Sequence, residues 1–279
     1  MIALVTDSTA GLTQAEARSW NVLVAPHSYS LNGNYYTETY AGENGAYPQA
    51  LRHSLARATL QASEDVFYCL FRHLQKQGME ILCPVISARL SGAYSAAATA
   101  AARLGGGIAV VDSQLTAGGL YLLVSRLRQE IDQNGLTLAE AAAACEEWKR
   151  RISVTFSVAK MDALRESRRI GVVRQSVNAM LNRRPVLLLQ RGSVASCGLA
   201  RGWREEKRLF LNLVPQNAGR VVVQYFEQKK NAAELAAELK QELRVPCILL
   251  REIGPVLSIH IGEDALAVSW ETPVPEQKK

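Results

Sequence analysis

Small hydroxyl and acidic residues follow three apolar runs of this chain, at the point where each run ends. These are Asp7 and Ser8 after residues 2–5, Ser87 after residues 81–86, and Asp112 and Ser113 after residues 108–111. A plausible helix follows each run, so the runs predict strands of a mostly parallel sheet. Ligands of such sheets bind beyond the carboxyl ends of the strands. The polar side chains there either line a polar site or cap the following helices.

A serine and a glycine precede an alanine-rich helical segment. Ser91 is a candidate N-cap, and the Gly92 backbone could approach a ligand closely. Amide groups at a helix N-terminus bind anions. The phosphate-loop pattern and GxGxxG are absent, so a carboxylate fits this position better than a nucleotide phosphate. The GxSxG elbow is absent too, which disfavours an acyl-enzyme at Ser91.

Two further residues are candidates for a site. His260 lies near the end of the apolar run from Val256 to Ile261, which we predict to be a strand. Ile261 and Gly262 follow it directly. It is either a satisfied core imidazole or a donor at a site. Thr59 begins a polar segment of small residues that we expect to be a loop between two helices. The histidine and cysteine spacings contain no HExxH and no CxxC, so no metal site is predicted.

The elements that must position these residues change character near the middle of the chain. Up to residue 152, strands alternate with helices, with capping boxes beginning at Thr13 and Thr137 and a hairpin signal at Asn32-Gly33. We therefore predict an α/β fold whose residues 1–152 form a Rossmann-like lobe with a mostly parallel sheet. Residues 153–279 contain short β-rich runs and two helices, and we predict a C-terminal α+β lobe with a mixed sheet.

Composition restricts the class of protein. The chain has 279 residues, 48% of them hydrophobic, and a net charge of +6. Its apolar runs are too short for a membrane span, and its first residues do not resemble a signal peptide, so we expect a cytoplasmic protein. The five cysteines lie far apart, and Cys83 and Cys247 are expected to be buried in strands. Basic clusters either form a solvated surface or attract nucleic acid, anionic lipid or an acidic protein.

Several short segments, taken in order, resemble the DegV family of bacterial fatty-acid-binding proteins, which includes the FakB-type acyl carriers of fatty acid kinase. The segments are residues 5–9, 59–63, 86–94, 111–113, 164–171 and 253–262. They extend over nearly the whole chain. Each segment is short, so the specificity of the resemblance lies in their joint order and spacing.

The resemblance implies a two-lobed fold in which one long-chain fatty acid lies in a tunnel between the lobes. It implies that Thr59, Ser91 and His260 hold the carboxylate. Supporting pocket residues would be Ser8, Gly92, Asp112, Ser113 and Gly262. The protein would be a lipid carrier with no catalytic residue and no cofactor other than its ligand. Its partners would be a fatty acid kinase and, through the basic patches, a membrane surface.

The chain departs from the family pattern at a few positions. Leu60 replaces a serine, Ala93 replaces a threonine, and Glu263-Asp264 replace a proline and a glycine. The segment at Ser167 to Ile170 differs as well. An arginine often found before the C-terminal helix is displaced, with Trp203 or Arg204 near that place. The acidic pair Glu263-Asp264 and the displaced arginine near Trp203 concern the recognition of a kinase more than the binding of a lipid.

Two alternatives remain open at the level of the sequence. One is a serine-dependent hydrolase or acyltransferase that uses Ser91 and His260, although no acidic partner for the histidine is apparent. The other is a nucleic-acid-binding regulator, suggested only by the positive charge. Aromatic residues are few and are not interleaved with the basic clusters, so a nucleic acid is not the expected partner.

Overall fold

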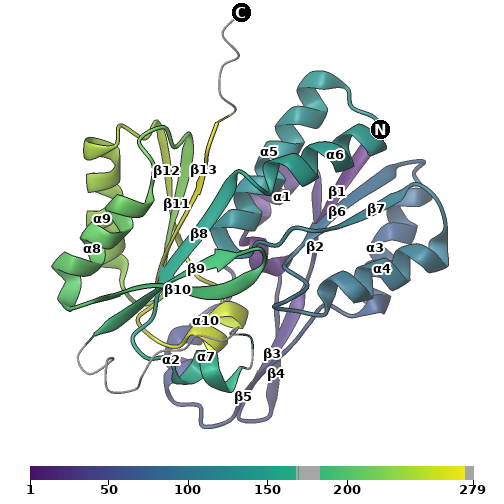
Figure 1. The fold of residues 1–279 in the computed structure, drawn as a ribbon. Helices are drawn as coiled ribbons and strands as arrows, with labels where there is room; N and C mark the ends of the chain where they lie inside the picture. The colour runs from purple at the N-terminus through teal and green to yellow at the C-terminus, as the bar shows by residue number, and fades with distance from the viewer. Residues whose placement is uncertain (168, 170–182, 274–279) are drawn as a thin grey trace, which may run out of the picture.

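The computed structural model describes residues 1–167, 169 and 183–273, and its strands form three sheets (Figure 1). Sheet A is parallel, with the strand order β2-β1-β6-β7. Its strands are β1 (Ile2–Asp7), β2 (Val22–Ala25), β6 (Glu80–Val85) and β7 (Ile108–Asp112). This sheet confirms the predicted parallel sheet and the three predicted strand ends.

Sheet C is mixed, as predicted, with the order β10-β9-β8-β13-β11-β12. Only the β11–β12 pair is parallel; the other pairs are antiparallel. The strands are β8 (Ile152–Ser157), β9 (Arg184–Gln190), β10 (Ser193–Ala200), β11 (Arg220–Tyr225), β12 (Cys247–Glu252) and β13 (Leu266–Glu271). The two-lobed α/β fold class is confirmed by sheets A and C together.

Helices cover both sheets and also separate them (Figure 1). Helices α3 and α4 pack on one face of sheet A, α5 packs between sheets A and C, and α8 and α9 cover the outer face of sheet C. The bounds are α1 (Gln14–Ser19), α3 (Glu64–Gln75), α4 (Ala93–Leu104), α5 (Ala117–Asn134), α6 (Leu138–Trp148), α8 (Gly202–Leu213) and α9 (Lys229–Glu242). Both predicted capping boxes, at Thr13 and Thr137, are present.

Sheet B contains the hairpin predicted at Asn32-Gly33, formed by β3 and β4, and adds a third strand, β5, that the sequence analysis did not predict. It has the antiparallel order β4-β3-β5, with β3 (His27–Leu31), β4 (Asn34–Glu38) and β5 (Arg57–Leu60). Next to it lie the short helices η1 (Ser8–Ala10), α2 (Tyr47–Arg52), α7 (Asp162–Glu166) and α10 (Pro255–Ile261). Because α10 contacts both β3 and β5, a division at residues 1–152 and 153–279 stays a prediction.

Three local predictions are wrong. The run from Val256 to Ile261 is not a strand but helix α10, because Gly254 is its N-cap and Pro255 occupies the first helical turn. Thr59 does not lie in a loop between helices but on strand β5. Cys247 is exposed rather than buried, whereas Cys83 is buried as expected.

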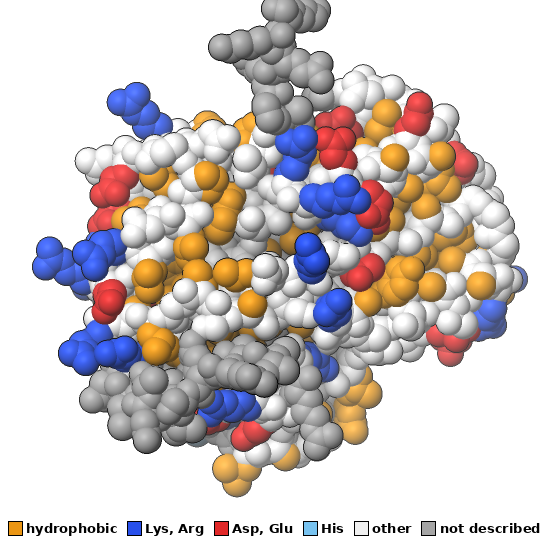
Figure 2. Space-filling model, viewed as in Figure 1, with side chains coloured by type: hydrophobic (Ala, Val, Ile, Leu, Met, Phe, Trp, Pro, Cys, Tyr) orange, Lys and Arg blue, Asp and Glu red, His pale blue; other side chains and the backbone are white. Residues whose placement is uncertain are grey.

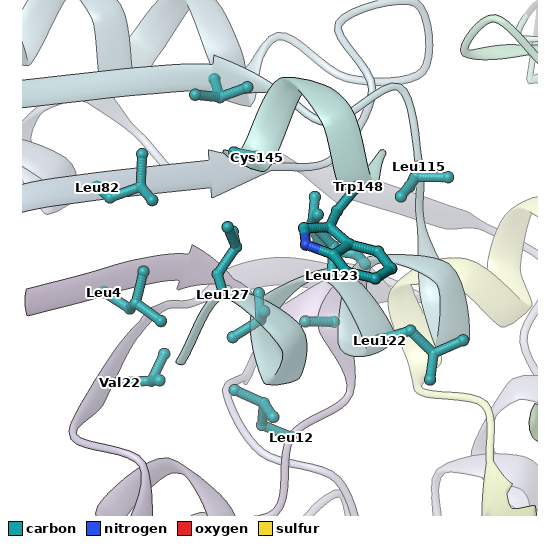
Figure 3. Close-up of a cluster of buried hydrophobic side chains, with 14 of the residues drawn as sticks. Leu4, Leu12, Val22, Leu82, Leu115, Leu122, Leu123, Leu127, Cys145 and Trp148 are labelled. Atoms are coloured by element: carbon teal, nitrogen blue, oxygen red, sulfur yellow. The ribbon is translucent and has the colours of Figure 1, made fainter. Parts of the chain in front are cut away.

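Two glycines in the first turn of α5, Gly118 and Gly119, allow this helix to pack closely against sheet C. A Cβ atom on Gly118 would lie 2.9 Å from the Val222 side chain, and one on Gly119 would collide with Val154. The Gly118 amide donates a hydrogen bond to the Gln224 side chain at 2.6 Å. The same helix contributes to the hydrophobic core against sheet A, where Leu123 and other buried side chains pack together (Figure 3). Helix α5 therefore packs against both sheets and links them.

Candidate functional site

A largely apolar cavity of about 160 Å³ lies where sheet B, sheet C and α10 meet the loop after β6. Its hydrophobic wall includes Ile86, Leu90, Val154, Phe156, Leu164, Leu189, Val194, Ile253, Val256, Leu257, Ile261 and Ala267. Its polar lining consists of Thr9, His27, Thr59, Gln61, Ser91, Thr116, Ser167, Arg169 and His260. Such a cavity suits an apolar ligand that carries a small polar group.

Helix α10 presents one face to this cavity. Val256, Leu257, His260 and Ile261 all line it, at the i, i+1, i+4, i+5 spacing of one helical face. The same residues belong to the short apolar run that predicted a strand. The helical conformation therefore brings His260 to the same wall as three hydrophobic side chains.

Three residues from distant parts of the chain form a hydrogen-bonded cluster at the cavity, the Thr59–His260–Arg169 cluster. The Arg169 guanidinium donates to His260 Nδ1 at 3.0 Å, and His260 Nε2 lies 2.7 Å from Thr59 Oγ1. Because an arginine only donates, Nδ1 must accept, and the proton of the neutral imidazole is then on Nε2. That N–H donates to Thr59, whose own hydroxyl proton remains available to a ligand.

The electrostatics of this cluster favour the neutral imidazole. Burial, followed by the positive charge of Arg169, lowers the pKa of His260 to about 4. Burial also lowers the pKa of Arg169. At neutral pH the cluster therefore holds one guanidinium charge and an uncharged imidazole, a suitable setting for one ligand carboxylate.

Ser91 lies on the loop that Arg169 holds in place. The Arg169 Nε–H donates to the Leu90 carbonyl at 2.6 Å, which ties this loop to the cluster. The N-cap of α4 is Gly92 rather than Ser91, although Ser91 Oγ accepts a hydrogen bond from the Ala93 amide at 3.3 Å. A Cβ atom on Gly92 would collide with the Gln61 side chain. A side chain at position 92 would therefore displace the end of the Gln61 side chain, and the Ser91 hydroxyl keeps a proton to donate.

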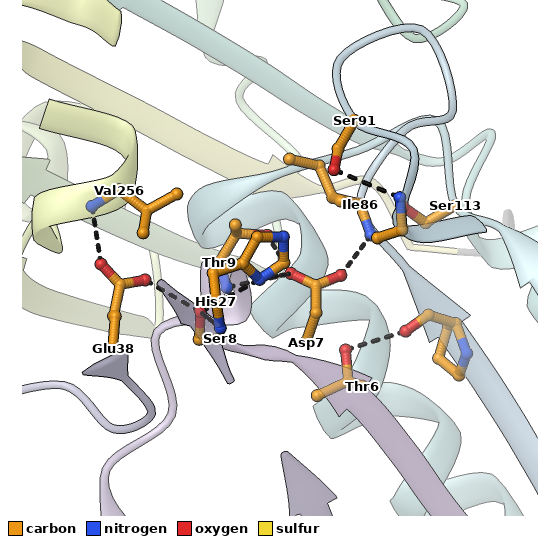
Figure 4. Close-up of polar contacts among 12 residues, drawn as sticks. Thr6, Asp7, Ser8, Thr9, His27, Glu38, Ile86, Ser91, Ser113 and Val256 are labelled. Carbon is orange, nitrogen blue, oxygen red and sulfur yellow. Dashed lines mark hydrogen bonds and ion pairs between the residues drawn. The ribbon is translucent and has the colours of Figure 1, made fainter. Parts of the chain in front are cut away.

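A second group of polar residues, the carboxylate cluster, lies at the other end of α10 (Figure 4). It consists of Asp7, Ser8, His27 and Glu38, and each is at most 4% exposed. Glu38 accepts from the Val256 amide at 2.8 Å and from Ser8 Oγ at 3.0 Å. Asp7 accepts from the Ile86 amide at 2.6 Å. These bonds hold the start of α10 to sheet B and the loop after β6 to sheet A.

Burial has a large effect on the acidity of Glu38. It raises the pKa of this carboxyl to about 7, although the hydrogen bonds from Val256 and Ser8 act in the opposite direction. Burial likewise lowers the pKa of His27, against the attraction of the Asp7 carboxylate. The carboxylate cluster therefore contains two groups whose charged forms are disfavoured.

The structure separates the predicted site residues into two sets. Thr59, Ser91 and His260 line the one cavity, whereas Ser8, Gly92, Asp112, Ser113 and Gly262 are not among its lining residues. Asp112 accepts hydrogen bonds from the Ala88 and Gln114 amides, both at 3.0 Å, and Ser113 Oγ accepts from the Leu115 amide at 3.0 Å. These two strand-end residues order the loops around the cavity but do not cap helix α5, whose N-cap is Thr116, so the capping interpretation is wrong for them.

Sequence reasoning missed several residues of this region. Arg169 lies in a segment quoted for the family resemblance, but its neighbours 168, 170 and 171 lie outside the described residues. Gln61 and Thr116 carried no signal beyond their position near a motif. His27 and Glu38 were missed because sheet B was not predicted beyond its hairpin, and their signal was only the strand pattern around Asn32-Gly33.

The comparison with protein families follows this geometry. A sequence model described as "Uncharacterised protein, DegV family" matches residues 1–273. The chain belongs to the DegV family. Among curated relatives, a DegV domain-containing protein of Deinococcus radiodurans is 28% identical over 280 residues, covering 97% of this chain and 98% of the relative. Another, from Halalkalibacterium halodurans, is 26% identical and covers 96% and 98%.

Solved DegV structures share the fold over almost the full length of the chain. One whose description reads "Fatty Acid Binding of a DegV family Protein from Thermus thermophilus" has a TM-score of 0.88 and 28% identity, covering 98% of this chain and 99% of that one. A stearic acid-binding protein from Eubacterium ventriosum has a TM-score of 0.84 at 23% identity, covering 97% and 98%. The second likeness bears on the fold alone.

The charged surface of this DegV protein carries both signs. Lys and Arg side chains gather over α8 with acidic side chains beside them (Figure 2). Arg201, Arg204 and Arg208 line a surface groove together with Glu205, Glu238 and Glu242. Within residues 1–167, 169 and 183–273, no helix is both long and apolar enough to cross a membrane.

Proposed function

We propose that this protein binds one long-chain fatty acid in the cavity between its lobes and carries it without transforming it chemically. The observation that carries the proposal is the Thr59–His260–Arg169 cluster beside an otherwise hydrophobic wall. The description of the Thermus thermophilus relative as fatty-acid-binding supports it.

In this proposal the carboxylate accepts hydrogen bonds from the Thr59 and Ser91 hydroxyls. Both hydroxyls have a proton to donate, because His260 already donates to Thr59 and the Ala93 amide already donates to Ser91. Arg169 supplies the balancing positive charge through His260, so a carboxylate removed from water is both hydrogen-bonded and paired. Asp112, Ser113, Gly92, Ser8 and Gly262 support the surrounding loops and helix ends.

The hydrocarbon chain supplies most of the affinity. Each buried CH₂ contributes about 0.8 kcal/mol, so an acyl chain along the hydrophobic wall binds tightly with few polar contacts. The described cavity wall comes from β8, β9, β10 and β13 of sheet C and from α10.

The geometry disfavours a serine hydrolase. The hydrogen-bond partners of His260 are Thr59 and Arg169, and no hydrogen bond joins His260 to Ser91. An imidazole with a pKa of about 4 is a weak base at neutral pH, and a guanidinium replaces the carboxylate that orients the histidine of a triad. We therefore expect no turnover of esters by the protein alone.

We propose further that a cytoplasmic fatty acid kinase receives the bound carboxylate and converts it to an acyl phosphate. The motif resemblance to acyl carriers supports this step. Of the residues that depart from the family pattern, Glu263 lies 3.8 Å from Arg57, and the Trp203 indole donates to Glu234 at 3.0 Å. Basic side chains over α8 are suited to a brief contact with an anionic membrane, where a lipid could be exchanged.

Native mass spectrometry of the purified protein, followed by denaturing lipid extraction, tests the binding proposal. We expect a bound species with the mass of a long-chain fatty acid, and that mass gives its length and unsaturation. A protein that carries no lipid and takes up neither palmitate nor oleate would contradict the proposal. Incubation with a fatty acid kinase and ATP, with hydroxylamine to trap acyl phosphate, tests the kinase step separately.

A further inference from the structure

One nitrogen in the cavity wall has no use in fatty acid binding as described above. His27 lines the cavity and is 3% exposed, yet its Nε2 atom is buried and has no hydrogen-bond partner among the described residues. A buried polar atom without a partner costs free energy unless a ligand or water supplies one. The orphan nitrogen therefore indicates a polar atom at this place in the bound state.

The other side of the imidazole determines which kind of atom is needed. When the Glu38 carboxyl is ionised, above its pKa of about 7, Ser8 Oγ donates its proton to Glu38 at 3.0 Å and accepts from its other neighbours. His27 Nδ1 lies 3.3 Å from Ser8 Oγ, and Asp7 Oδ1 lies 3.9 Å from the same nitrogen. The Ser8 oxygen as acceptor and the nearby negative charge of Asp7 both favour the proton on Nδ1. In the neutral ring Nε2 then carries a lone pair and requires a donor.

The sheet register places this lone pair near the carboxylate end of the cavity. Strands β3 and β5 pair antiparallel, with Tyr29 opposite Thr59. His27 lies two residues from Tyr29 and therefore shares a face with Thr59, as its diagonal neighbour, at a Cα separation of roughly 7–8 Å. A donor that reaches His27 is consequently close to the first carbons of a chain whose carboxylate binds Thr59.

A second orphan atom provides a comparison within the same cavity. Thr116 Oγ1 also lines the cavity wall and lacks a partner among the described residues. A hydroxyl can rotate to donate or to accept, so it does not specify its partner. The imidazole of His27 cannot adjust in this way, because Nδ1 and the backbone amide both engage Ser8. Of these two unpartnered atoms, only His27 Nε2 specifically requires a hydrogen-bond donor as its partner.

We propose that the preferred ligand is a fatty acid with a hydroxyl group close to its carboxylate, and that this hydroxyl donates to His27 Nε2. This inference depends on the proposed fatty acid binding and adds a ligand class to it. A plain acyl chain would place methylene groups against the orphan nitrogen. The hydroxyl of a 2- or 3-hydroxy acid would instead supply the donor that Nε2 lacks.

The test is a comparison of affinities within one chain length. Palmitate, 2-hydroxypalmitate, 3-hydroxypalmitate and 16-hydroxypalmitate are titrated against the full-length protein and against His27→Leu, with His27→Gln as the polar control. We expect the 2- or 3-hydroxy acid to bind roughly threefold to tenfold tighter than palmitate, the range for one neutral hydrogen bond. The 16-hydroxy acid carries its hydroxyl at the far end and should show no such gain.

The variants sharpen this comparison. In His27→Leu the ratio of hydroxypalmitate to palmitate affinity should fall to about one, whereas His27→Gln should retain part of the preference. Equal binding of palmitate and both near-head hydroxy acids by the native protein overturns the proposal, even if His27→Leu does not fold. Failure of all four acids to bind instead contradicts the proposed function itself, so the two failures are distinguishable.

Discussion

The two polar clusters at the two ends of α10 contain similar residues but have different roles, one structural and the other in the proposed ligand binding. The carboxylate cluster and the Thr59–His260–Arg169 cluster each join residues from β strands to this helix, and each contains a histidine. The first is at most 4% exposed, and its hydrogen bonds close on each other. The second is only partly buried and leaves the Thr59 hydroxyl proton available to the cavity.

The difference shows that residue type does not separate a structural cluster from a binding cluster. Burial raises the pKa of Glu38 and lowers that of His260, so both are driven towards the neutral form. The clusters differ because the Thr59–His260–Arg169 cluster keeps a hydroxyl donor, that of Thr59, available to the cavity. His27 belongs to the carboxylate cluster but also reaches the cavity, which is why its orphan nitrogen is informative.

Removal of the Asp7 carboxylate should have the largest effect on the free energy of unfolding. Asp7→Ala leaves the Ile86 amide and both the amide and hydroxyl of Thr9 without their acceptor. We expect a loss of about 3–5 kcal/mol of unfolding free energy, because each of these donors is buried. Urea denaturation measures it. Asp112→Ala, at a partly exposed strand end, is the control and should cost about 1 kcal/mol; equal losses would contradict the comparison.

Glu38→Gln should change the pH dependence of stability. The pKa of Glu38 is raised from 4.5 to about 7 in the folded protein, so its stabilising contribution is complete below pH 4.5 and is lost as pH rises to 7. Glutamine does not titrate. The stability of the variant relative to the native protein should therefore increase across this pH range, by about 3 kcal/mol of unfolding free energy at pH 8. A stability difference that is independent of pH would refute this account.

His260→Gln should show the opposite slope. Because the folded pKa of His260 is lowered from 6.5 to about 4, its contribution is complete above pH 6.5 and is lost as pH falls to 4. The native protein should thus lose about 2–3 kcal/mol relative to the variant over this window. Thermal denaturation of both proteins at a series of pH values measures it. A variant-minus-native stability difference that grows as pH rises, as for Glu38→Gln, would be inconsistent with the lowered pKa of His260.

The smallest effects concern ligand affinity rather than folding. Thr59→Ala and Ser91→Ala should each weaken fatty acid binding by about 1–3 kcal/mol, since each removes a hydroxyl donor to the carboxylate. Thr59→Ser keeps the hydroxyl and should bind nearly as well as the native protein. Isothermal titration with palmitate provides the values. Native affinity in both alanine variants would mean that the carboxylate lies elsewhere.

Much of the fold was predictable because local patterns and tertiary packing agreed. The strands at residues 2–7, 80–85 and 108–112 are apolar runs bounded by polar residues, the first two largely buried and the third half-buried, and the capping boxes at Thr13 and Thr137 mark helix starts. Helix α10 was mispredicted because its seven residues are too few to show a helical period clearly. The proline in its first turn was the stronger signal.

By itself, the sequence determined the family, the parallel and mixed sheets, and three hydroxyl or imidazole side chains that line one cavity. Only the tertiary structure decided that Thr59 meets His260, 201 residues away, and that Arg169 assigns the imidazole proton. It also decided that His27 faces the cavity with an unpartnered nitrogen. The physical reason is that hydrogen-bond direction and burial depend on contacts between residues far apart in the chain, which local patterns do not encode.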